Sequence, residues 1–502
     1  MIRSFVFAFA TAGLTLCAQT PCEQLKSLQL AGATITLAEA AAPGPFRLPG
    51  MPPNLTAITL PAHCRVAATL KPSSDSDIKI EVWLPAAPAW NGKYAAVGGG
   101  GWVGSINYGG MAGALLEGYA TSSTDTGHNS PGATFAVGHM EKVVDFAYRA
   151  VHEMTLKAKA IITARYGRGA RLAYYTGCST GGRQGLMEAQ RYPEDYDGIV
   201  AGAPANNQAH LSAWRFALET KVMRDPASVV PPEKLALLNR AVLTACDALD
   251  GVKDGFLADP RRCRFNPSTL LCRGDARDDC LTASQVEVVK MAYTAATKKN
   301  GDLIYPGLVP GGETGWALVS SVHEQPNQID IGMYRYVVHQ DPEWDWRTFD
   351  MERDVGLADE KVGFIDAINP DLSAFKARGG KLLIYHGWND GGSAGAISPL
   401  NTLNYFSSVL AKMGPNQDDW LRLFMVPGMA HCGGGPGPNQ FNAPAALERW
   451  RESGVAPGQI VASRVNNNRL DMTRPLCPYP QVAVYSGVGS TNDAENFACK
   501  AP

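Results

Sequence analysis

Short apolar runs that alternate with helix-compatible segments dominate the first two hundred residues of the chain. Residues 78–84 alternate apolar and polar side chains as a half-buried strand does, and residues 94–97 form a second short apolar run. Residues 111–116 and 136–165 have the composition of helices, and residues 199–204 predict the next strand. Repeated strand–helix units of this kind predict a parallel sheet with crossover helices, and therefore an α/β fold.

The pattern changes between residues 205 and 375 and then returns. In this stretch Trp, Tyr, Pro, Asp and four cysteines accumulate, and the regular alternation of strands and helices is lost. Buried strands are again predicted at residues 381–385 and 421–426. We therefore expect one α/β domain built from residues 19–204 and 376–502, interrupted by an inserted lid domain of residues 205–375.

The first 18 residues have the pattern of a signal peptide. Arg3 supplies a positive charge, residues 5–16 supply an apolar core, and Cys17-Ala18 is a plausible cleavage site. A lipid anchor on Cys17 is the alternative, which the bulky Leu16 before it disfavours. The apolar run is short for a membrane anchor, and no later run is long enough to span a bilayer. We expect residues 1–18 to be removed and the protein to be secreted or periplasmic.

Composition adds limits on the binding partners. The chain has 502 residues, 45% of them hydrophobic and 18% charged, with a formal net charge of −2. This composition is that of a globular protein with a sizeable core. Basic residues are not clustered, so neither nucleic acid nor, after removal of the signal peptide, a membrane is expected as a partner.

Ten cysteines remain once Cys17 is set aside, an even number that indicates a disulfide framework in an exported chain. A zinc site is disfavoured because no Cys-x-x-Cys pair occurs. Proximity along the chain suggests four pairs and leaves two cysteines for each other. The expected disulfides are Cys22–Cys64, Cys246–Cys263, Cys272–Cys280, Cys477–Cys499 and, by elimination, Cys178–Cys432.

The segment Gly177-Cys178-Ser179-Thr180-Gly181 lies between a β-rich run and a helix-compatible segment. This is the context of a nucleophile elbow, in which a serine on a tight strand-to-helix turn projects its hydroxyl above the sheet. The helix that follows offers free N–H groups and its positive dipole end to an oxyanion. A second Gly-x-Ser-x-Gly at residues 391–395 lacks a cysteine beside its Ser393 and shares the loop of a candidate acid. We therefore predict Ser179 as the nucleophile.

A serine nucleophile needs a base and a carboxylate that orients the base. In α/β-hydrolases the acid and then the histidine follow the serine in the chain, each on a loop after a strand. Asp390 and His431 occupy these positions, directly after the two late strands. His386 lies in the acid's own loop, where we expect it to pack or to orient a neighbour.

The two cysteines left over by the pairing stand next to the candidate nucleophile and base. The Cα atoms of a disulfide lie about 5–6 Å apart. If Cys178 and Cys432 pair, Ser179 and His431 are therefore brought close to hydrogen-bonding distance. An ordinary long-range disulfide is the alternative, and the catalytic interpretation is favoured because both cysteines adjoin candidate residues.

The glycine run Gly98–Gly101 follows a predicted strand and has two interpretations. One is the oxyanion loop of an esterase, in which backbone N–H groups of Gly101 (or a neighbouring glycine) and Thr180 point at the developing oxyanion. The other is a dinucleotide-binding fingerprint, because Gly99-x-Gly101-x-x-Gly104 fits the pattern and Asp125 lies about twenty residues further on. An exported, disulfide-rich chain disfavours a nicotinamide cofactor.

Carboxylates are concentrated between turn glycines in residues 246–256. Hard cations such as Ca²⁺ take several carboxylate and carbonyl oxygens from one such loop. The spacing is not that of an EF-hand. On these residues alone, a solvated Asp-Gly turn beside a disulfide explains the pattern equally well.

Taken together, these motifs resemble the tannase and feruloyl esterase family of α/β-hydrolases, which includes enzymes of the mono-hydroxyethyl terephthalate (MHET) hydrolase type. The resemblance extends over most of the mature chain. The segments that carry it are Gly98–Gly101, Ser123-Thr-Asp-Thr-Gly-His128, Gly177–Gly182, Asp250–Asp254, His386–Asp390 and His431-Cys432.

The resemblance implies an α/β-hydrolase fold with a large inserted lid domain. It implies a triad of nucleophile Ser179, acid Asp390 and base His431, with the disulfide Cys178–Cys432 joining the nucleophile and base segments. It also implies a structural Ca²⁺ in the lid domain. The implied ligands are the side chains of Asp247, Asp250 and Asp254 and the carbonyl groups of Val252 and Phe256.

The expected activity is that of a serine carboxylesterase on small-molecule esters of aromatic acids. Asp390 is followed by Gly391-Gly-Ser-Ala, where the family often has a proline and then a hydrophobic residue. This loop tends to face the substrate, so hydroxycinnamate, gallate and terephthalate half-esters all remain candidate acyl groups. Trp316 and the aromatic residues of 334–346 are expected to form the acyl-ring pocket. The alternatives are an MHET-hydrolase-like activity and a non-catalytic secreted binding protein on a hydrolase fold.

Overall fold

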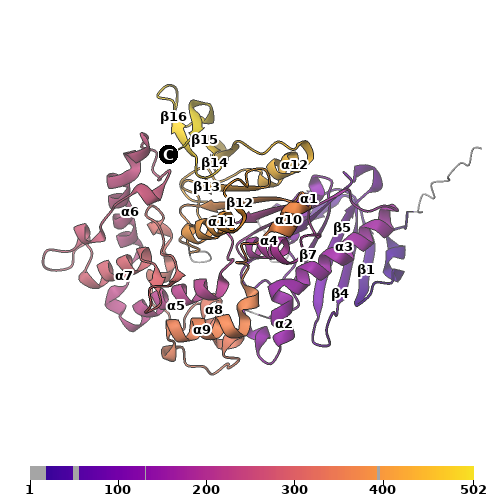
Figure 1. The fold of residues 1–502 in the computed structure, drawn as a ribbon, viewed down its shortest axis with the longest axis horizontal. Coiled ribbons are helices and arrows are strands. Elements are labelled where there is room, and N and C mark those ends of the chain that lie inside the picture. The colour runs from indigo at the N-terminus through magenta and orange to yellow at the C-terminus, as the bar shows by residue number, and fades with distance from the viewer. Residues whose placement is uncertain (1–18, 49–55, 131, 393–395, 502) are drawn as a thin grey trace, which may run out of the picture.

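The computed structural model describes residues 19–48, 56–130, 132–392 and 396–501 (Figure 1). The expected signal peptide, residues 1–18, and Ser393 of the second Gly-x-Ser-x-Gly lie outside these ranges. None of the helices in the described ranges is long and apolar enough to cross a bilayer.

A nine-stranded sheet forms the centre of the molecule, in the order β1-β4-β5-β7-β6-β8-β9-β12-β13. From β7 onward neighbouring strands run parallel, whereas β1, β4, β5 and β7 pair antiparallel. The strands are β1 (Ala33–Ala41), β4 (His63–Leu70), β5 (Ile78–Pro85), β6 (Lys93–Val97), β7 (Ala120–Thr124), β8 (Leu172–Cys178), β9 (Gly198–Gly202), β12 (Lys381–Gly387) and β13 (Leu421–Val426).

The mixed pairing corrects the expectation of a wholly parallel sheet. Residues 71–77 connect β4 and β5, which is too short for the crossover that a parallel pair requires, so these strands form a hairpin. The parallel part contains the strands predicted at residues 94–97, 381–385 and 421–426, and it carries the predicted site at its carboxyl edge. The strand predicted at residues 78–84 is β5, which lies in the antiparallel part.

Helices cover both faces of this sheet because successive strand residues point to opposite sides. Within β8, Tyr175 packs in the core on one face and Tyr174 packs in the core on the other. The first face is covered by α3 (Ala150–Tyr166), α4 (Thr180–Arg191) and α11 (Pro399–Met413), and the second by α1 (Tyr108–Leu116) and α12 (Ala443–Ser453). The segment before α3 contains α2 (Met140–Val144) and a π-helical turn at Asp145–Arg149.

The region between β9 and β12 is mainly helical, and we call residues 205–375 the lid (Figure 1). Its apolar core includes Trp214 and Tyr334 and is continuous with Trp102 and Phe146, which belong to the segments around the sheet. The lid therefore packs directly on the residues that follow β6. Its elements are α5 (Gln208–Arg224), α6 (Pro232–Cys246), α7 (Ala283–Tyr293), β10 (Ala296–Thr297), β11 (Leu303–Tyr305), α8 (Gln328–Gly332) and α9 (Met351–Val362), and α10 (Ser373–Ala377) closes the region.

Two-stranded pairs complete the fold. They are β2 (Gly44–Phe46) with β3 (Ile58–Leu60), β14 (Ile460–Asn466) with β15 (Arg469–Leu476), and β16 (Val482–Tyr485) with β17 (Phe497–Lys500). The structure contains the five disulfides that the sequence analysis expected: Cys22–Cys64, Cys178–Cys432, Cys246–Cys263, Cys272–Cys280 and Cys477–Cys499.

Candidate active site

Ser179 stands alone between strand β8 and helix α4, in a strained backbone conformation. Its φ is 63° and its ψ is −123°, a region that L-residues rarely adopt. The Ser179 N–H donates to the Gly202 carbonyl oxygen at 3.0 Å, and the Ser179 carbonyl oxygen accepts from the Ala205 N–H at 3.1 Å. The segment after β9 therefore holds the turn in place, and the side chain remains half-buried.

Glycines on both sides of Ser179 are required by close backbone contacts. A Cβ on Gly177 would lie 2.5 Å from the Gly181 carbonyl oxygen, and a Cβ on Gly181 would lie 2.8 Å from the Gly99 carbonyl oxygen. The turn and the glycine run after β6 thus touch each other through backbone atoms. This contact explains why the Gly-x-Ser-x-Gly pattern and the run Gly98–Gly101 occur in the same chain.

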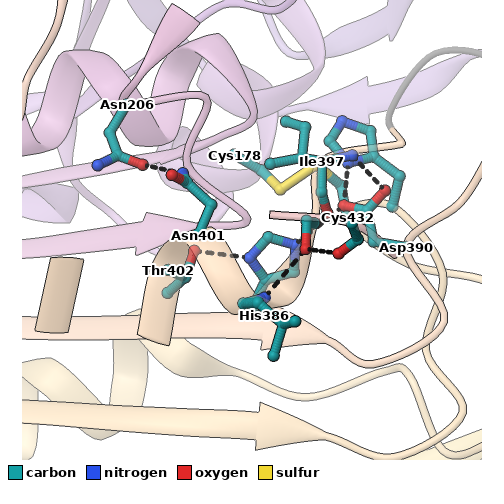
Figure 2. Close-up of polar contacts among 12 residues, drawn as sticks. Cys178, Asn206, His386, Asp390, Ile397, Asn401, Thr402 and Cys432 are labelled. Carbon is teal, nitrogen blue, oxygen red and sulfur yellow. Dashed lines mark hydrogen bonds and ion pairs between the residues drawn. A yellow bond between two sulfur atoms is a disulfide. The ribbon is translucent and has the colours of Figure 1, made fainter. Parts of the chain in front are cut away.

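Asp390 lies just beyond β12 and is hydrogen-bonded by two histidines (Figure 2). The Nδ1 atom of His431 is 2.7 Å from Asp390 Oδ2, and the Nε2 atom of His386 is 3.1 Å from the same oxygen. Because a carboxylate only accepts, His431 carries its proton on Nδ1 and its Nε2 is free to act as a base.

The residue Asp390 is 2% exposed, yet its carboxylate stays ionised. Burial raises the pKa of Asp390, but the charge of His431 and the hydrogen bonds from both histidines outweigh burial and lower this pKa to about 2. A fixed negative charge beside His431 is what stabilises an imidazolium during proton transfer.

The disulfide Cys178–Cys432 joins the serine turn to the histidine loop, with 6.0 Å between the two Cα atoms (Figure 2). Each cysteine is the sequence neighbour of a candidate residue, Ser179 or His431. In the described part of the chain no hydrogen bond joins these two side chains directly. Contacts of this kind commonly tighten only when substrate binds.

The run Gly98–Gly101 lies against the first turn of α4. The Thr180 hydroxyl donates to the Gly101 carbonyl oxygen at 2.6 Å, and the Gly99 N–H donates to Gln184 Oε1 at 3.2 Å. Thr180 is the first residue of α4, so its N–H has no partner within the helix. The arrangement suits an oxyanion site formed by backbone N–H groups of Gly101 and Thr180.

The geometry around Asp125 disfavours the dinucleotide interpretation. Asp125 Oδ1 accepts from the backbone N–H groups of Lys79 at 2.9 Å and Gly127 at 2.8 Å. This carboxylate serves to hold the turn after β7 and is not directed at a ribose. Gly104 in turn packs against His128, whose Nε2 is 2.8 Å from the Trp102 carbonyl oxygen.

The lid contacts the acid loop through small residues. Asn389 Nδ2 donates to the Gly311 carbonyl oxygen at 2.7 Å, and a Cβ on Gly391 would lie 2.7 Å from the Trp316 ring. Trp316 itself is buried. Gly391 therefore makes room for Trp316, whereas a Cβ on Gly392 would lie 4.0 Å from the Gly315 carbonyl oxygen, an ordinary contact.

The aromatic residues of 334–346 were expected to form the acyl-ring pocket, and the structure corrects this expectation. Tyr334, Trp344 and Trp346 are buried within the core of the lid. Tyr334 donates to the Ala209 carbonyl oxygen, and Phe349 packs edge-on against Tyr334 and Trp344. The sequence composition shows that aromatic residues are present in the lid, but it does not show whether they point into the core of the lid or toward the active site.

The lid loop implied to bind Ca²⁺ has a donor set that fits a hard cation. Asp247 Oδ1 and Asp254 Oδ1 are buried without a hydrogen-bond partner, and carboxylates in that state favour a bound cation. The guanidinium of Arg474 supplies one positive charge here, because it donates to Asp254 Oδ2 at 2.6 Å. With Asp250, the loop has three carboxylates and the one guanidinium. When all three carboxylates are ionised, their excess negative charge matches the charge of a divalent cation.

A different group brings its ligand atoms closest together. Among the described residues, His152, Glu188 and Asp195 form the set of three whose donor atoms all lie within 4.8 Å of one another. His152 Nδ1 is 2.6 Å from Asp195 Oδ2, a hydrogen-bond distance. Two ligands of a tetrahedral zinc lie about 3.3 Å apart, given bonds of roughly 2.0 Å. The pair therefore has the geometry of a hydrogen bond and not that of a metal site.

Two polar residues of the site were not singled out from the sequence. Gln184 accepts from the Gly99 N–H, and Tyr175 Oη lies 3.0 Å from the same Gln184 oxygen. Arg183 is fully buried and donates to the carbonyl oxygens of Ala147 and Ile365. The available signal was their position among the first five residues of the helix after Ser179.

Comparisons with known proteins show the family to which the chain belongs. The sequence model described as tannase and feruloyl esterase matches residues 64–500. An uncharacterized esterase of Xanthomonas campestris pv. campestris is 35% identical over 541 residues, covering 97% of this chain and 92% of its own. The probable feruloyl esterase B-2 of Aspergillus terreus is 34% identical, covering 87% of this chain and 86% of its own.

A solved structure shares the whole fold. The crystal structure of feruloyl esterase B from Aspergillus oryzae matches with a TM-score of 0.87 at 32% identity, covering 95% of this chain and 99% of its own. The fold is that of an α/β-hydrolase, and the chain is a carboxylic ester hydrolase. It belongs to the tannase and feruloyl esterase family.

Proposed function

We propose that this protein is a serine carboxylesterase that hydrolyses esters of aromatic acids through an acyl-enzyme. The observation that carries the proposal is the disulfide Cys178–Cys432, which ties Ser179 to the loop of His431. The hydrogen bond from His431 Nδ1 to Asp390 supports it, because that bond leaves Nε2 free as a general base.

In the proposed reaction Ser179 Oγ attacks the ester carbonyl carbon while His431 Nε2 takes the hydroxyl proton. Asp390 keeps the imidazole in the required tautomer and stabilises the imidazolium. Backbone N–H groups of Thr180 and Gly101 donate to the oxyanion of the tetrahedral intermediate. Collapse of the intermediate expels the alcohol, which receives the proton from His431. A water molecule, activated by the same histidine, then releases the acid.

The proposed acyl group is aromatic, with a hydroxycinnamate as the first choice. The supporting observation is the likeness, over most of the chain, to proteins named feruloyl esterase. The lid is the candidate acyl-binding region, because the segment Gly311–Trp316 packs on the loop of Asp390. On this proposal the α/β part is residues 19–204 and 376–502 and the lid is residues 205–375.

Export and calcium binding complete the proposal. Five disulfides fit an oxidising compartment, and with the signal-peptide pattern they support a secreted or periplasmic protein. When bound, Ca²⁺ would link the lid loop by coordination to Asp247, Asp250 and Asp254 and to the carbonyls of Val252 and Phe256. Its role would be structural, since this loop adjoins the disulfide Cys246–Cys263 and carries none of the triad residues.

A panel of esters tests the proposed substrate class. Methyl ferulate, methyl gallate, mono-hydroxyethyl terephthalate and p-nitrophenyl butyrate are compared, with Ser179→Ala as the control. We expect kcat/KM to be highest for methyl ferulate and to be lost in Ser179→Ala for every ester. Hydrolysis that survives in Ser179→Ala would reject the nucleophile. A folded, oxidised protein that hydrolyses none of the four would favour a binding protein on this fold.

A further inference from the structure

His386 is a second histidine on the triad carboxylate, and its surroundings fix its protonation. Its Nε2 atom faces two acceptors, Asp390 Oδ2 at 3.1 Å and the Ile397 carbonyl oxygen at 3.1 Å (Figure 2). Neither oxygen can donate, so Nε2 carries a proton. Its Nδ1 atom is 2.7 Å from the Thr402 hydroxyl, which can donate to it.

These contacts connect three elements through one imidazole. His386 belongs to β12, Thr402 to α11, and Ile397 to the segment between the acid loop and α11. Both His386 and Thr402 are completely buried. The Ile397 N–H also reaches Asp390 Oδ1, at 3.3 Å. The carboxylate is therefore held on both oxygens, with His386 and His431 sharing Oδ2.

We propose that His386 is a positioning residue for the reaction: its Nε2–H holds Asp390 in the orientation that receives His431, and it weakens the carboxylate as a proton acceptor. This inference rests on the proposed function. A buried carboxylate with one donor removed can turn about its χ angles, which would carry His431 away from the Ser179 hydroxyl. Conversely, every donor that shares the charge of Asp390 lowers the basicity that Asp390 confers on His431.

The remaining titratable group near this carboxylate does not compete with His386. Tyr305 of β11 faces Asp390, and burial first and then the charge of Asp390 raise the pKa of Tyr305. Tyr305 therefore stays neutral throughout the working pH range. Among the described residues, the side chains that hydrogen-bond the Asp390 carboxylate are therefore His386 and His431.

The test compares His386→Leu with His386→Gln. Leucine removes the donor at similar volume, whereas the glutamine amide can reach both Asp390 Oδ2 and the Ile397 carbonyl oxygen. We expect His386→Leu to lower kcat for p-nitrophenyl butyrate about 10- to 100-fold with little change in KM, the effect of losing a hydrogen bond to a charged group. We expect the acidic limb of its kcat/KM profile to move to higher pH, and His386→Gln to remain close to wild type in both respects.

A matched control separates positioning from simple packing. His63 is also a buried histidine, and it begins β4, the second strand from the edge of the sheet. Its Nδ1 atom is 2.9 Å from the Pro61 carbonyl oxygen, and among the described residues His63 makes no hydrogen bond or ring contact with a proposed triad residue. His63→Leu should lower the melting temperature without moving the acidic limb. If His386→Leu does not fold, Thr402→Val removes the partner of Nδ1 and should lower kcat to a smaller extent, with a limb shift in the same direction.

The outcomes distinguish this inference from the proposed function. Rates of Ser179 modification by a fluorophosphonate are measured alongside kcat, because they do not depend on the acyl group. Wild-type labelling at Ser179 without hydrolysis of aromatic esters rejects only the substrate class. No labelling at Ser179 rejects the nucleophile, and the inference with it. Two results would overturn the positioning role alone. In the first, His386→Leu has the kcat of wild type and the same acidic limb in its kcat/KM profile. In the second, His386→Leu and His386→Gln lose the same amount of kcat and the acidic limb does not move in either variant.

Discussion

Cys178 and Cys432, 254 residues apart in the sequence, form a disulfide between the turn of the proposed nucleophile and the loop of the proposed base. Each cysteine directly adjoins one of the two residues that must exchange a proton. The covalent bond therefore limits the distance between Ser179 and His431 independently of the packing of β8 and β13. A reducing environment would remove this limit.

The double variant Cys178→Ser/Cys432→Ser tests the contribution of this disulfide to catalysis. A displacement of roughly 1 Å between reacting groups costs about 100-fold in rate, and we expect kcat to fall by that order. The control is Cys477→Ser/Cys499→Ser, which removes the disulfide at the C-terminal strands and should affect stability but not kcat. Equal kcat values in the first variant and in wild type would contradict the role of this disulfide.

Two glycines of the run after β6, Gly98 and Gly100, differ in the space around them, so substitution of each by alanine tests the proposed oxyanion site. A Cβ on Gly98 would lie 2.2 Å from Tyr175 Oη and 2.8 Å from Gly181 Cα, whereas a Cβ on Gly100 would meet nothing within 4 Å. Gly98→Ala should displace the oxyanion loop and lower kcat about 100- to 1,000-fold, the range for losing an oxyanion donor. Gly100→Ala should remain close to wild type. Equal activity in the two variants would show that this loop does not form the oxyanion site.

Calcium removal tests the proposed metal loop. Dialysis against a chelator should lower the melting temperature, and added Ca²⁺ should restore it; an ion present at 100 times its dissociation constant adds about 2.7 kcal/mol to the free energy of unfolding. Asp254→Asn should abolish this response to Ca²⁺. Asp278→Asn, at an exposed position elsewhere in the lid, should retain it. A melting temperature that is independent of Ca²⁺ in the wild-type protein would reject the site.

A buried carboxyl group in the lid predicts a pH dependence of stability. Burial raises the pKa of Glu219 to about 7, although the Asn327 N–H bonds to both of its oxygens. Between about pH 4.5 and 7 the folded protein therefore binds a proton that the unfolded chain has lost, so the stability from this group is complete below about pH 4.5 and declines as pH rises to about 7.

Substitution of Glu219 isolates this effect. Glu219→Gln cannot ionise, so relative to wild type its free energy of unfolding should increase by about 3 kcal/mol between pH 4 and pH 8. Denaturant unfolding at several pH values measures the difference. Glu287→Gln, at an exposed position on α7, is the control and should not reproduce this increase. A constant difference for Glu219→Gln as well would contradict the raised pKa.

The parallel half of the sheet could be predicted because its strands are short apolar runs bounded by turns. Residues 94–97, 381–385 and 421–426 lie within β6, β12 and β13 of the parallel part. Residues 78–84 were also predicted as a strand, and they lie within β5 of the antiparallel part. The antiparallel edge was not predicted as such, because strand direction depends on connection length and pairing more than on apolar pattern. The lid was recognised only by the loss of alternation, since its helices pack on several sides and show little periodicity.

The residues of the candidate site could be proposed from the sequence where local patterns mark them. Ser179 is marked by glycines that the backbone contacts require, and Asp390 and His431 are marked by their place after buried strands. The contact of His386 with Asp390 depends on which way a β12 side chain points and on Thr402 in a later helix. The prediction that the lid aromatics form the acyl-ring pocket was wrong for a related reason. Tyr334 and Trp344 point into the core of the lid, and composition does not show the direction of a side chain.

The most direct test of the central claim is to trap the acyl-enzyme. The oxidised protein is mixed with the p-nitrophenyl ester of a hydroxycinnamic acid, quenched within the first turnover and analysed by peptide mass spectrometry. We predict a burst of p-nitrophenol and an added acyl mass on the peptide that contains Ser179, both absent in Ser179→Ala. An acyl mass on another residue, or hydrolysis with neither a burst nor a modified Ser179 during turnover, would contradict the account.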